Sequence, residues 1–213
     1  MTGDLYTDRF TDADAQAKDL VWREVCRFLA PYVDGPVIDI GCDRGYFIRN
    51  IAADERWASD VRDVSAAMPS GVRFVQGGGL DLERLVPNGH FGTVFMSNYL
   101  EHLRTRDDVL QQMRVAATLL QPGGRVVVLQ PNIRLVGAAY WDFIDHHVAL
   151  TEKSLVEAGE AAGFRTERLI VRFLPYTTKS RLPKAGSLVR WYLRLPIAWR
   201  VFGGQTLYVG RRP

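Results

Sequence analysis

The chain has 213 residues, of which 47% are hydrophobic, 24% charged and 11% aromatic. This composition is ordinary for a globular protein and excludes fibrous, collagen-like and wholly disordered classes, and the length suits one domain. Two cysteines, Cys26 and Cys42, are too few for a disulfide framework or a zinc cluster. The sequence shows neither the apolar segment of a signal peptide nor the roughly 18 apolar residues that a membrane-spanning helix needs. We therefore expect a cytoplasmic protein.

The net charge of +3 is unevenly distributed along the chain. Residues 1–167 contain 17 basic residues and all 24 acidic residues, whereas residues 168–213 contain ten basic residues and no acid. The same C-terminal segment carries aromatic side chains such as Trp191 and Trp199. A basic, aromatic segment indicates an anionic partner such as phosphate, a membrane surface or nucleic acid, or else a solvated edge of the domain.

Apolar periodicity predicts an alternation of helices and strands. Apolar residues recur at three- and four-residue steps over residues 13–30, which predicts a helix that Pro31 ends. Short β-branched or apolar runs predict strands over residues 37–40, 56–61, 72–76, 93–98, 125–130, 165–174 and 206–211. Further helices are predicted over residues 46–53, 108–120 and 151–162.

This alternation predicts an α/β fold with a doubly wound, mostly parallel seven-stranded sheet and helices on both faces. The last two strands break the pattern and are expected to form a C-terminal antiparallel hairpin. The segment between them begins at Pro175 and contains Pro183 and Pro196, so it cannot form one long helix. We divide the single domain into a helical cover (1–30), a core (31–174), an insertion (175–204) and a final strand (205–213).

The turn after the first predicted strand reads IDIGCDRG (residues 38–45). In doubly wound sheets, ligands bind at the carboxyl ends of the strands, where the strand order reverses. The glycines here are four residues apart, so the turn is not the G-x-G-x-x-G of dinucleotide-binding folds, and it lacks the Lys-Ser/Thr of a phosphate-binding loop. Alone, this turn is weak evidence for a particular ligand.

The order of several segments is more specific. IDIGCDRG is followed by WASD (57–60), VRFVQGG (72–78), FGTVFMSNYLEHL (91–103), LLQPGGRVVVLQPN (119–132) and SLVEAGEAAGF (154–164). Over residues 20–175 this succession resembles the class I S-adenosylmethionine-dependent methyltransferases, with their Rossmann-like fold. A narrower resemblance, carried by YWDFIDHHVALTEKSL (140–155) and RFLPYTTKSRLP (172–183), is to small bacterial methyltransferases of polysaccharide, glycoconjugate or natural-product pathways.

The resemblance implies that S-adenosylmethionine binds in the core. Asp39 would lie near the ammonium of the cofactor's methionine part, and Asp60 would accept hydrogen bonds from both ribose hydroxyls, because a carboxylate offers two acceptor oxygens. The wall beside the sulfonium would be formed after the fourth strand. The cofactor-binding residues that the resemblance implies are Asp39, Gly41, Cys42, Asp43, Gly45, Asp60, Gly79, Leu80, Asn98, Leu100 and His102.

Two positions depart from the family's pattern. Asp43 stands where the family has its middle glycine, and aspartate tolerates left-handed backbone angles at modest cost. Gly78 stands where many relatives have an acid that binds adenine, so adenine would depend on the backbone of Gly79 and Leu80, or on Asp81.

If the acceptor is a hydroxyl, a general base assists methyl transfer, and histidine is the usual candidate. His146 and His147 follow Asp145 in a loop after the fifth strand, and an adjacent carboxylate can fix the tautomer of an imidazole. We expect one of these two histidines to be the base, while His102 either orients its loop or takes part in catalysis. No arrangement of acids and histidines has metal-ligand spacing, so no metal is expected.

Substrate contacts are expected from Tyr140, Trp141, Tyr176 and Arg181. Tyr140 and Trp141 would stack on an acceptor ring or cap the core, and Arg181 could hold a phosphate or carboxylate. The segment over residues 187–203 is compatible with contact to an anionic membrane surface, or with packing on the sheet. Nucleic acid is not expected as the acceptor, because residues 97–100 read SNYL and not the (Asn/Asp)-Pro-Pro-(Tyr/Phe) of amino-methylating enzymes.

These expectations together predict O-methylation of a small molecule such as a sugar, a glycoconjugate or a natural-product intermediate. The alternative is a methyltransferase fold without catalysis that serves as a binding or scaffold protein.

Overall fold

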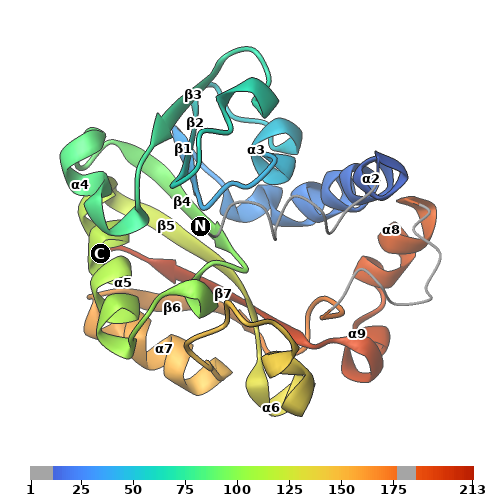
Figure 1. Cartoon of the computed structure of the whole chain (residues 1–213). Helices are drawn as coiled ribbons and strands as arrows, with labels where there is room; N and C mark the ends of the chain where they lie inside the picture. The colour runs from blue at the N-terminus through green and yellow to red at the C-terminus, as the bar shows by residue number, and fades with distance from the viewer. Residues whose placement is uncertain (1–11, 177–185) are drawn as a thin grey trace.

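A computed structural model describes residues 12–176 and 186–213 of the chain (Figure 1). Within these residues, seven strands form one sheet in the order β3-β2-β1-β4-β5-β7-β6. Strands β1 to β5 run parallel to one another, and β7 is antiparallel to both β5 and β6. The predicted sheet with its C-terminal antiparallel hairpin is therefore confirmed. The strands are β1 (Val37–Ile40), β2 (Arg56–Asp60), β3 (Val72–Gln76), β4 (Phe91–Ser97), β5 (Leu120–Pro131), β6 (Arg165–Ile170) and β7 (Gln205–Arg211).

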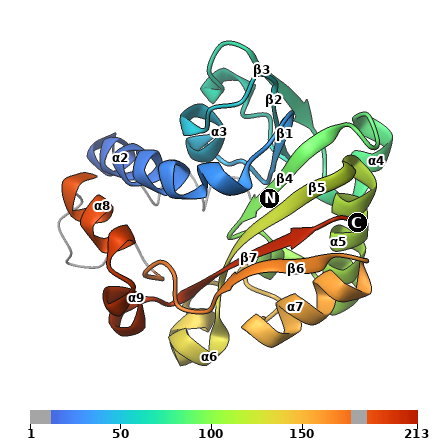
Figure 2. The same ribbon diagram turned by 180° about the vertical axis from the view of Figure 1, so that it is seen from behind.

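Helices cover both faces of this sheet, as the two opposite views show (Figures 1 and 2). One face packs on α4 (Leu82–Leu85), α5 (Arg106–Leu119) and α7 (Glu152–Ala161). The other face packs on α2 (Asp12–Leu29), α3 (Tyr46–Asn50), α8 (Gly186–Arg194) and α9 (Pro196–Phe202). The remaining short helices are η1 (Ala30–Tyr32), η2 (Ser65–Ala67), η3 (Gly79–Asp81), η4 (Leu100–His102), α6 (Ile133–Val136) and η5 (Gly137–Asp142).

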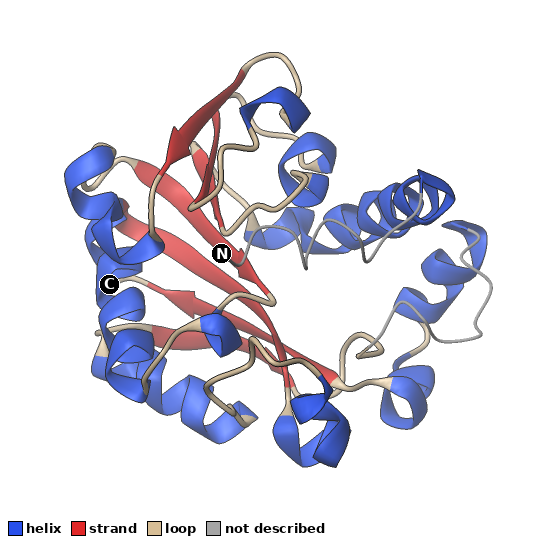
Figure 3. Cartoon of the chain, viewed as in Figure 1, coloured by secondary structure: helices blue, strands red, loops and turns tan. Residues whose placement is uncertain are grey.

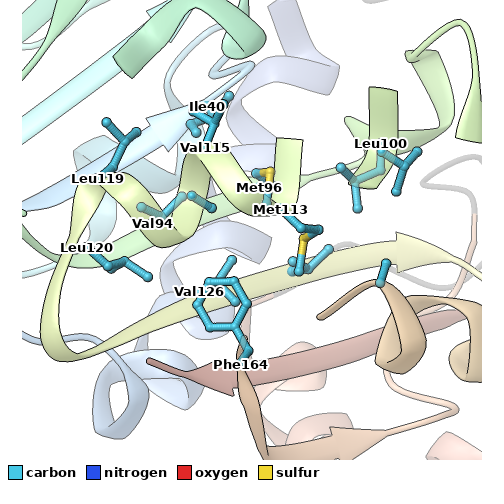
Figure 4. Packing of buried hydrophobic residues seen from close by; sticks show 14 of the residues in the cluster. Ile40, Val94, Met96, Leu100, Met113, Val115, Leu119, Leu120, Val126 and Phe164 are labelled. Carbon is cyan, nitrogen blue, oxygen red and sulfur yellow. The ribbon is translucent and has the colours of Figure 1, made fainter. Parts of the chain in front are cut away.

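The central strands show why the two cores form. In β5, Val126 and Val128 point into the core with α5 and α7, whereas Val127 and Leu129 point into the core with α2 and α3. Alternation of side chains between the two faces explains why this strand reads as a continuous apolar run. Figure 4 shows the first core, in which Met96 of β4 and Met113 of α5 pack beside Val126.

Several element boundaries differ from those predicted. α3 ends at Asn50, whose side chain donates to the carbonyl of Tyr46 at 2.9 Å, and the next residue is extended. α5 begins two residues early because Thr105 and Asp108 form a capping box. β6 ends at Ile170 because the backbone bends at Val171 and Arg172; Phe173 then still donates to the carbonyl of Gln205, the first residue of β7.

Residues 186–204 of the insertion, which the structure describes, form two short helices, drawn blue in Figure 3. These helices, α8 and α9, meet at Leu195. The break comes immediately before Pro196, as its ring requires. Arg190 of α8 donates to the carboxylate of Glu24 in α2 at 2.9 and 2.8 Å, so α8 lies beside α2. In the described ranges, none of the helices has the length and apolar character needed to cross a membrane.

Candidate functional site

The turn between β1 and α3 has a left-handed backbone at three positions. The φ angles are +70° at Gly41, +49° at Asp43 and +69° at Gly45. A Cβ atom on Gly41 would lie 2.5 Å from the ring of Tyr99, so only glycine fits there. Asp43 takes the left-handed conformation that the sequence analysis allowed for it. The turn therefore keeps the close backbone approach that a bound cofactor requires.

The carboxylate of Asp60 at the end of β2 faces this turn. It accepts a hydrogen bond from the backbone N–H of Asp43 at 3.1 Å. It also accepts from Arg62: the backbone N–H and Nε each lie 3.0 Å from Oδ1, and Nη2 lies 3.1 Å from Oδ2. The guanidinium of Arg62 also contacts Asp43 Oδ1 at 3.1 Å, and these carboxylates raise the pKa of Arg62. Both oxygens of Asp60 are therefore engaged, and binding of ribose hydroxyls requires the guanidinium to move.

Sequence analysis did not identify Arg62. Its only signal was its place two residues after the acid that ends β2.

Asp39 is a buried carboxylate beneath the same turn. Its side chain is 3% exposed, and burial, together with the nearby charges of Asp60 and Asp43, raises its pKa well above the usual range. A cationic group entering this turn would stabilise the charged form of Asp39. Lys18 of α2 also lies at this turn, with Nζ 3.9 Å from Asp43 Oδ2. These carboxylates and the glycine backbone fit the ammonium end of S-adenosylmethionine.

Cys42 also lies in this turn, and its side chain is buried. Burial raises the pKa of its thiol, so its side chain packs as a neutral group. Its backbone N–H donates to the carbonyl of Ser59.

The loops after β3 and β4 pack against each other through Tyr99. The hydroxyl of Tyr99 donates to Gln112 Oε1 at 2.9 Å. A Cβ atom on Gly79 would lie 2.3 Å from this hydroxyl, so Gly79 serves the packing of the loops. A Cβ atom on Gly78 would contact only Asp81 Oδ2, at 3.3 Å. The carboxylate of Asp81 thus lies beside the position where many relatives have their adenine-binding acid. Binding of adenine by Leu80 or Asp81 stays a prediction.

Leu100 was predicted to form part of the cofactor-binding wall after β4, and its position in the structure contradicts this. Its side chain is fully buried in the core with Met96 and Met113, so it cannot contact a cofactor. Asn98 is exposed at the end of β4, with φ +47° and its N–H bonded to the carbonyl of Leu129. Asn98 therefore remains a candidate, whereas Leu100 does not.

His102 belongs to a second group of side chains, the acceptor-side cluster, which consists of Glu101, His102 and His146. One possible ligand atom from each residue lies within 4.8 Å of the other two. The carbonyl of Glu101 accepts from the N–H groups of His147 and Val148 at 2.8 and 3.2 Å, which joins η4 to the loop after η5. The fold thus brings together His102, which was predicted to line the cofactor wall, and His146, which was predicted to be a candidate base.

Backbone carbonyls orient both imidazoles of this cluster. His102 Nδ1 lies 3.0 Å from the carbonyl oxygen of Asp145, and His146 Nδ1 lies 2.8 Å from that of Tyr140. The two rings lie 5.1 Å apart between centroids. Glu101 is 1% exposed, and burial raises the pKa of its carboxyl group, while His102 opposes this shift. His147 has an exposed side chain.

The aromatic residues near this cluster divide between core and surface. Tyr140 is fully buried and donates to the carbonyl of Val148 at 2.6 Å, which corrects its assignment as a substrate contact. Trp141 is 52% exposed. The ring of Phe143 lies 5.1 Å from that of His146 and 6.2 Å from that of Tyr176. The predicted contact Arg181 lies outside the described residues.

The arrangement of a glycine turn after β1, an acid after β2 and a histidine-containing cluster after β4 can be compared with known proteins. Residues 13–169 match the family model described as a methyltransferase domain. The chain belongs to this family. It is a class I methyltransferase whose cofactor is S-adenosylmethionine, which confirms the family and cofactor that the sequence indicated and supports an enzyme over a scaffold.

Solved structures support the same fold. An S-adenosylmethionine-dependent methyltransferase from Archaeoglobus fulgidus has a TM-score of 0.65 at 16% identity, with 92% of this chain and 94% of that chain covered. The geranyl diphosphate C-methyltransferase of Streptomyces coelicolor, solved with S-adenosyl-L-homocysteine among its ligands, has a TM-score of 0.62 at 15% identity, with 89% and 77% covered.

Among curated proteins, the methyltransferase matches the tRNA U34 carboxymethyltransferase of Syntrophotalea carbinolica. The two are 30% identical over 120 residues, which is 52% of this chain and 36% of the relative. The match thus spans little more than a third of the length of that relative.

Proposed function

We propose that this methyltransferase transfers a methyl group to a hydroxyl oxygen of a small acceptor, such as a sugar, a glycoconjugate or a natural-product intermediate. The observation that carries the proposal is the place of the acceptor-side cluster. β1 and β4 are neighbours in register, with Ile40 opposite Met96. Their loops meet where Tyr99 packs on Gly41. The cluster begins two residues after Tyr99, so its first member follows this contact directly in the chain.

The turn after β1 and the acid that ends β2 would hold different parts of the cofactor. Asp39 and the backbone of Gly41 would hold its methionine part, and Asp60 would accept from its ribose once Arg62 moves. When bound, S-adenosylmethionine supplies an electrophilic methyl group on a sulfonium. The protein's task is to hold the acceptor oxygen in line with that methyl group, at about 3–3.5 Å from its carbon. The acceptor oxygen would gain the methyl group as the sulfur gives it up, and the hydroxyl proton would pass to a nitrogen of the acceptor-side cluster.

The geometry favours His146 over His147 as the residue that acts on the hydroxyl. His146 Nδ1 faces the carbonyl of Tyr140, which favours the tautomer in which Nδ1 carries the proton. In that tautomer the lone pair is on Nε2, the nitrogen that can act on an acceptor. His147 is exposed and is not part of the cluster.

An acceptor screen tests this function. The purified protein is incubated with methyl-labelled S-adenosylmethionine and either nucleotide sugars, glycolipids or natural-product hydroxyl compounds, and label in the product is counted. Formation of a methyl ether in one of these classes supports the proposal. Transfer only to nitrogen or carbon, or to no member of the three classes, would contradict it.

An RNA acceptor is the second candidate. It is favoured by the curated relative, which is a tRNA carboxymethyltransferase, and by the ten basic residues of segment 168–213. The absence of the amino-methylation motif does not bear on methylation of oxygen. A filter-binding titration with tRNA tests it: affinity that falls steeply between low and moderate salt, together with label transfer to tRNA, would favour this candidate.

A further inference from the structure

We propose that the acceptor-side cluster of Glu101, His102 and His146 binds a divalent transition-metal ion that coordinates the acceptor oxygen. The role of the ion rests on the proposed function, but its binding does not. No metal was expected from the sequence, because no arrangement of acids and histidines shows metal-ligand spacing; His102 and His146 are 44 residues apart in the chain.

The first support is geometric. One ligand atom from each residue lies within 4.8 Å of the other two. Tetrahedral ligands at about 2.1 Å from a zinc-like ion lie about 3.4 Å from one another. The 4.8 Å limit exceeds that spacing by about 1.4 Å, so the three atoms already lie close to the mutual spacing of a bound ligand set.

The second support is the orientation of the imidazoles. Metal-binding histidines almost always donate their other ring N–H to a carbonyl or carboxylate. His102 Nδ1 lies 3.0 Å from the carbonyl oxygen of Asp145 and 3.6 Å from its carboxylate. His146 Nδ1 lies 2.8 Å from the carbonyl oxygen of Tyr140. Both rings thus present Nε2 as the lone-pair nitrogen, as a ligand set requires.

The third support is the state of Glu101. Its side chain is 1% exposed, and Oε2 has no hydrogen-bond partner among the residues that the structure describes. A buried carboxylate oxygen normally has a partner, because an unpaired one has lost its hydration without compensation. A cation held by this oxygen and the two imidazoles supplies that partner.

The donor set indicates the class of ion. Two imidazole nitrogens and one carboxylate oxygen suit zinc, manganese or ferrous iron better than magnesium or calcium, which prefer oxygen ligands. Three protein ligands leave at least one coordination position open. A hydroxyl bound there becomes more acidic, so it releases its proton to water and attacks as an alkoxide. His146 then acts as a ligand, and the ion takes over activation of the hydroxyl.

Calorimetric titration with Mn²⁺ and Zn²⁺ tests the site directly. Tag-free protein is first freed of metal with a chelator, and bound metal is also counted by elemental analysis. We expect one ion per chain, with affinity lowered at least about 10-fold in Glu101→Gln and His146→Ala. His147→Ala, which removes the neighbouring exposed imidazole, is the matched control and should bind as the wild type does.

The outcomes separate this proposal from the proposed function. No stoichiometric binding, or equal binding by Glu101→Gln and the wild type, would overturn the metal site. Circular dichroism shows whether each variant is folded. Metal binding without methyl transfer to any hydroxyl would overturn the proposed function and leave the metal site standing, whereas methyl transfer that survives chelation would remove the ion from the reaction.

A second, independent inference concerns the outer surface of α8 and α9. We infer that this surface contacts an anionic membrane. The side chains exposed on it form an apolar set that we call the α8–α9 face: Leu188, Trp191, Leu195, Ile197, Val201 and Phe202.

The exposure of these side chains and the charges beside them both support contact with an anionic membrane. Trp191, Ile197 and Val201 lie within 11 residues of one another in the chain and are 62%, 66% and 67% exposed. Exposed Arg194 and Arg200 lie on the same two helices; segment 168–213 contains no acid, and Glu24 of α2 is the acid that pairs with Arg190 of α8. Apolar side chains flanked by arginines are typical of helices that lie in the headgroup region of anionic lipids.

Vesicle sedimentation tests the α8–α9 face. The full chain is mixed with vesicles of phosphatidylcholine alone or with about 30% of the anionic lipid phosphatidylglycerol added. We expect binding to the anionic vesicles only, reduced at least about 10-fold in the double variant Trp191→Ser, Ile197→Ser. Trp141→Ser, which removes an exposed tryptophan elsewhere, is the control. Equal binding to both vesicles, no binding, or full binding by the double variant would overturn the inference.

Discussion

The guanidinium of Arg62 engages both carboxylate oxygens of Asp60, with Nε 3.0 Å from Oδ1 and Nη2 3.1 Å from Oδ2. The same guanidinium reaches Asp43 in the turn after β1. Arg62 therefore neutralises two acids at the place where the cofactor ribose is expected. If the ribose binds to Asp60, its hydroxyls must compete with this guanidinium for the same acceptor atoms.

This competition predicts the effect of removing Arg62. In Arg62→Ala the oxygens of Asp60 are free to accept from the ribose, so affinity for S-adenosylhomocysteine should rise severalfold, about 1 kcal/mol for one hydrogen-bonded contact. Isothermal titration calorimetry measures this change. Weaker binding by the variant would show instead that Arg62 holds the cofactor or its turn in place.

His146→Ala and His147→Ala distinguish the two neighbouring histidines. We expect turnover with the true acceptor to fall by about 10²-fold or more in His146→Ala, because His146 lies in the acceptor-side cluster. His147→Ala should retain most of its turnover, and both variants should bind S-adenosylhomocysteine as the wild type does. Equal losses in the two variants would contradict the assignment.

Gly79 and Gly78 form a matched pair for a stability test. Gly79→Ala places a methyl group 2.3 Å from the hydroxyl of Tyr99 and 2.5 Å from Gln112 Oε1. This overpacking should lower the free energy of unfolding by about 1–3 kcal/mol. In Gly78→Ala the added methyl group would contact only Asp81 Oδ2 among the described residues. This variant should therefore change the free energy of unfolding by less. Urea unfolding at neutral pH measures both changes, and equal effects would contradict the packing of Tyr99 described above.

The contact between α2 and α8 predicts a dependence of stability on pH. Hydrogen bonds from Arg190 lower the pKa of Glu24. A carboxyl group with a lowered pKa stabilises the fold above its unfolded pKa, about 4.3, and this contribution is lost as the pH falls through the folded value. The Tm of Glu24→Gln should thus lie below that of the wild type at pH 6–8, and the difference should shrink at lower pH. A Tm difference between the two proteins that stays constant down to pH 3 would exclude the Glu24–Arg190 ion pair as its source.

Local patterns predicted most of the fold. The continuous apolar run of β5 identified a strand buried on both faces, and Pro196 identified the break between α8 and α9. Boundaries set by single hydrogen bonds were missed, such as the end of α3 at Asn50. Such an end depends on one side chain capping one carbonyl, which periodicity does not encode.

The site was predicted only in part, and the reason is topological. The glycine turn and Asp60 follow directly from strand ends that can be read in the sequence. The cluster of Glu101, His102 and His146 forms because the loop after η5 folds back onto η4 through backbone hydrogen bonds to Glu101. Leu100 was misassigned because the position after β4 was known, whereas the direction of its side chain was not.

The central claim is that the turn after β1 and the acid after β2 bind S-adenosylmethionine despite Asp43, Gly78 and Arg62. Calorimetric titration of the wild type with S-adenosylhomocysteine, beside Asp60→Ala and the exposed-acid control Asp63→Ala, tests it most directly. The account predicts one site with Kd on the order of 1–100 μM, weakened at least about 10-fold in Asp60→Ala and unchanged in Asp63→Ala. No binding by the wild type, or equal binding by Asp60→Ala, would contradict it.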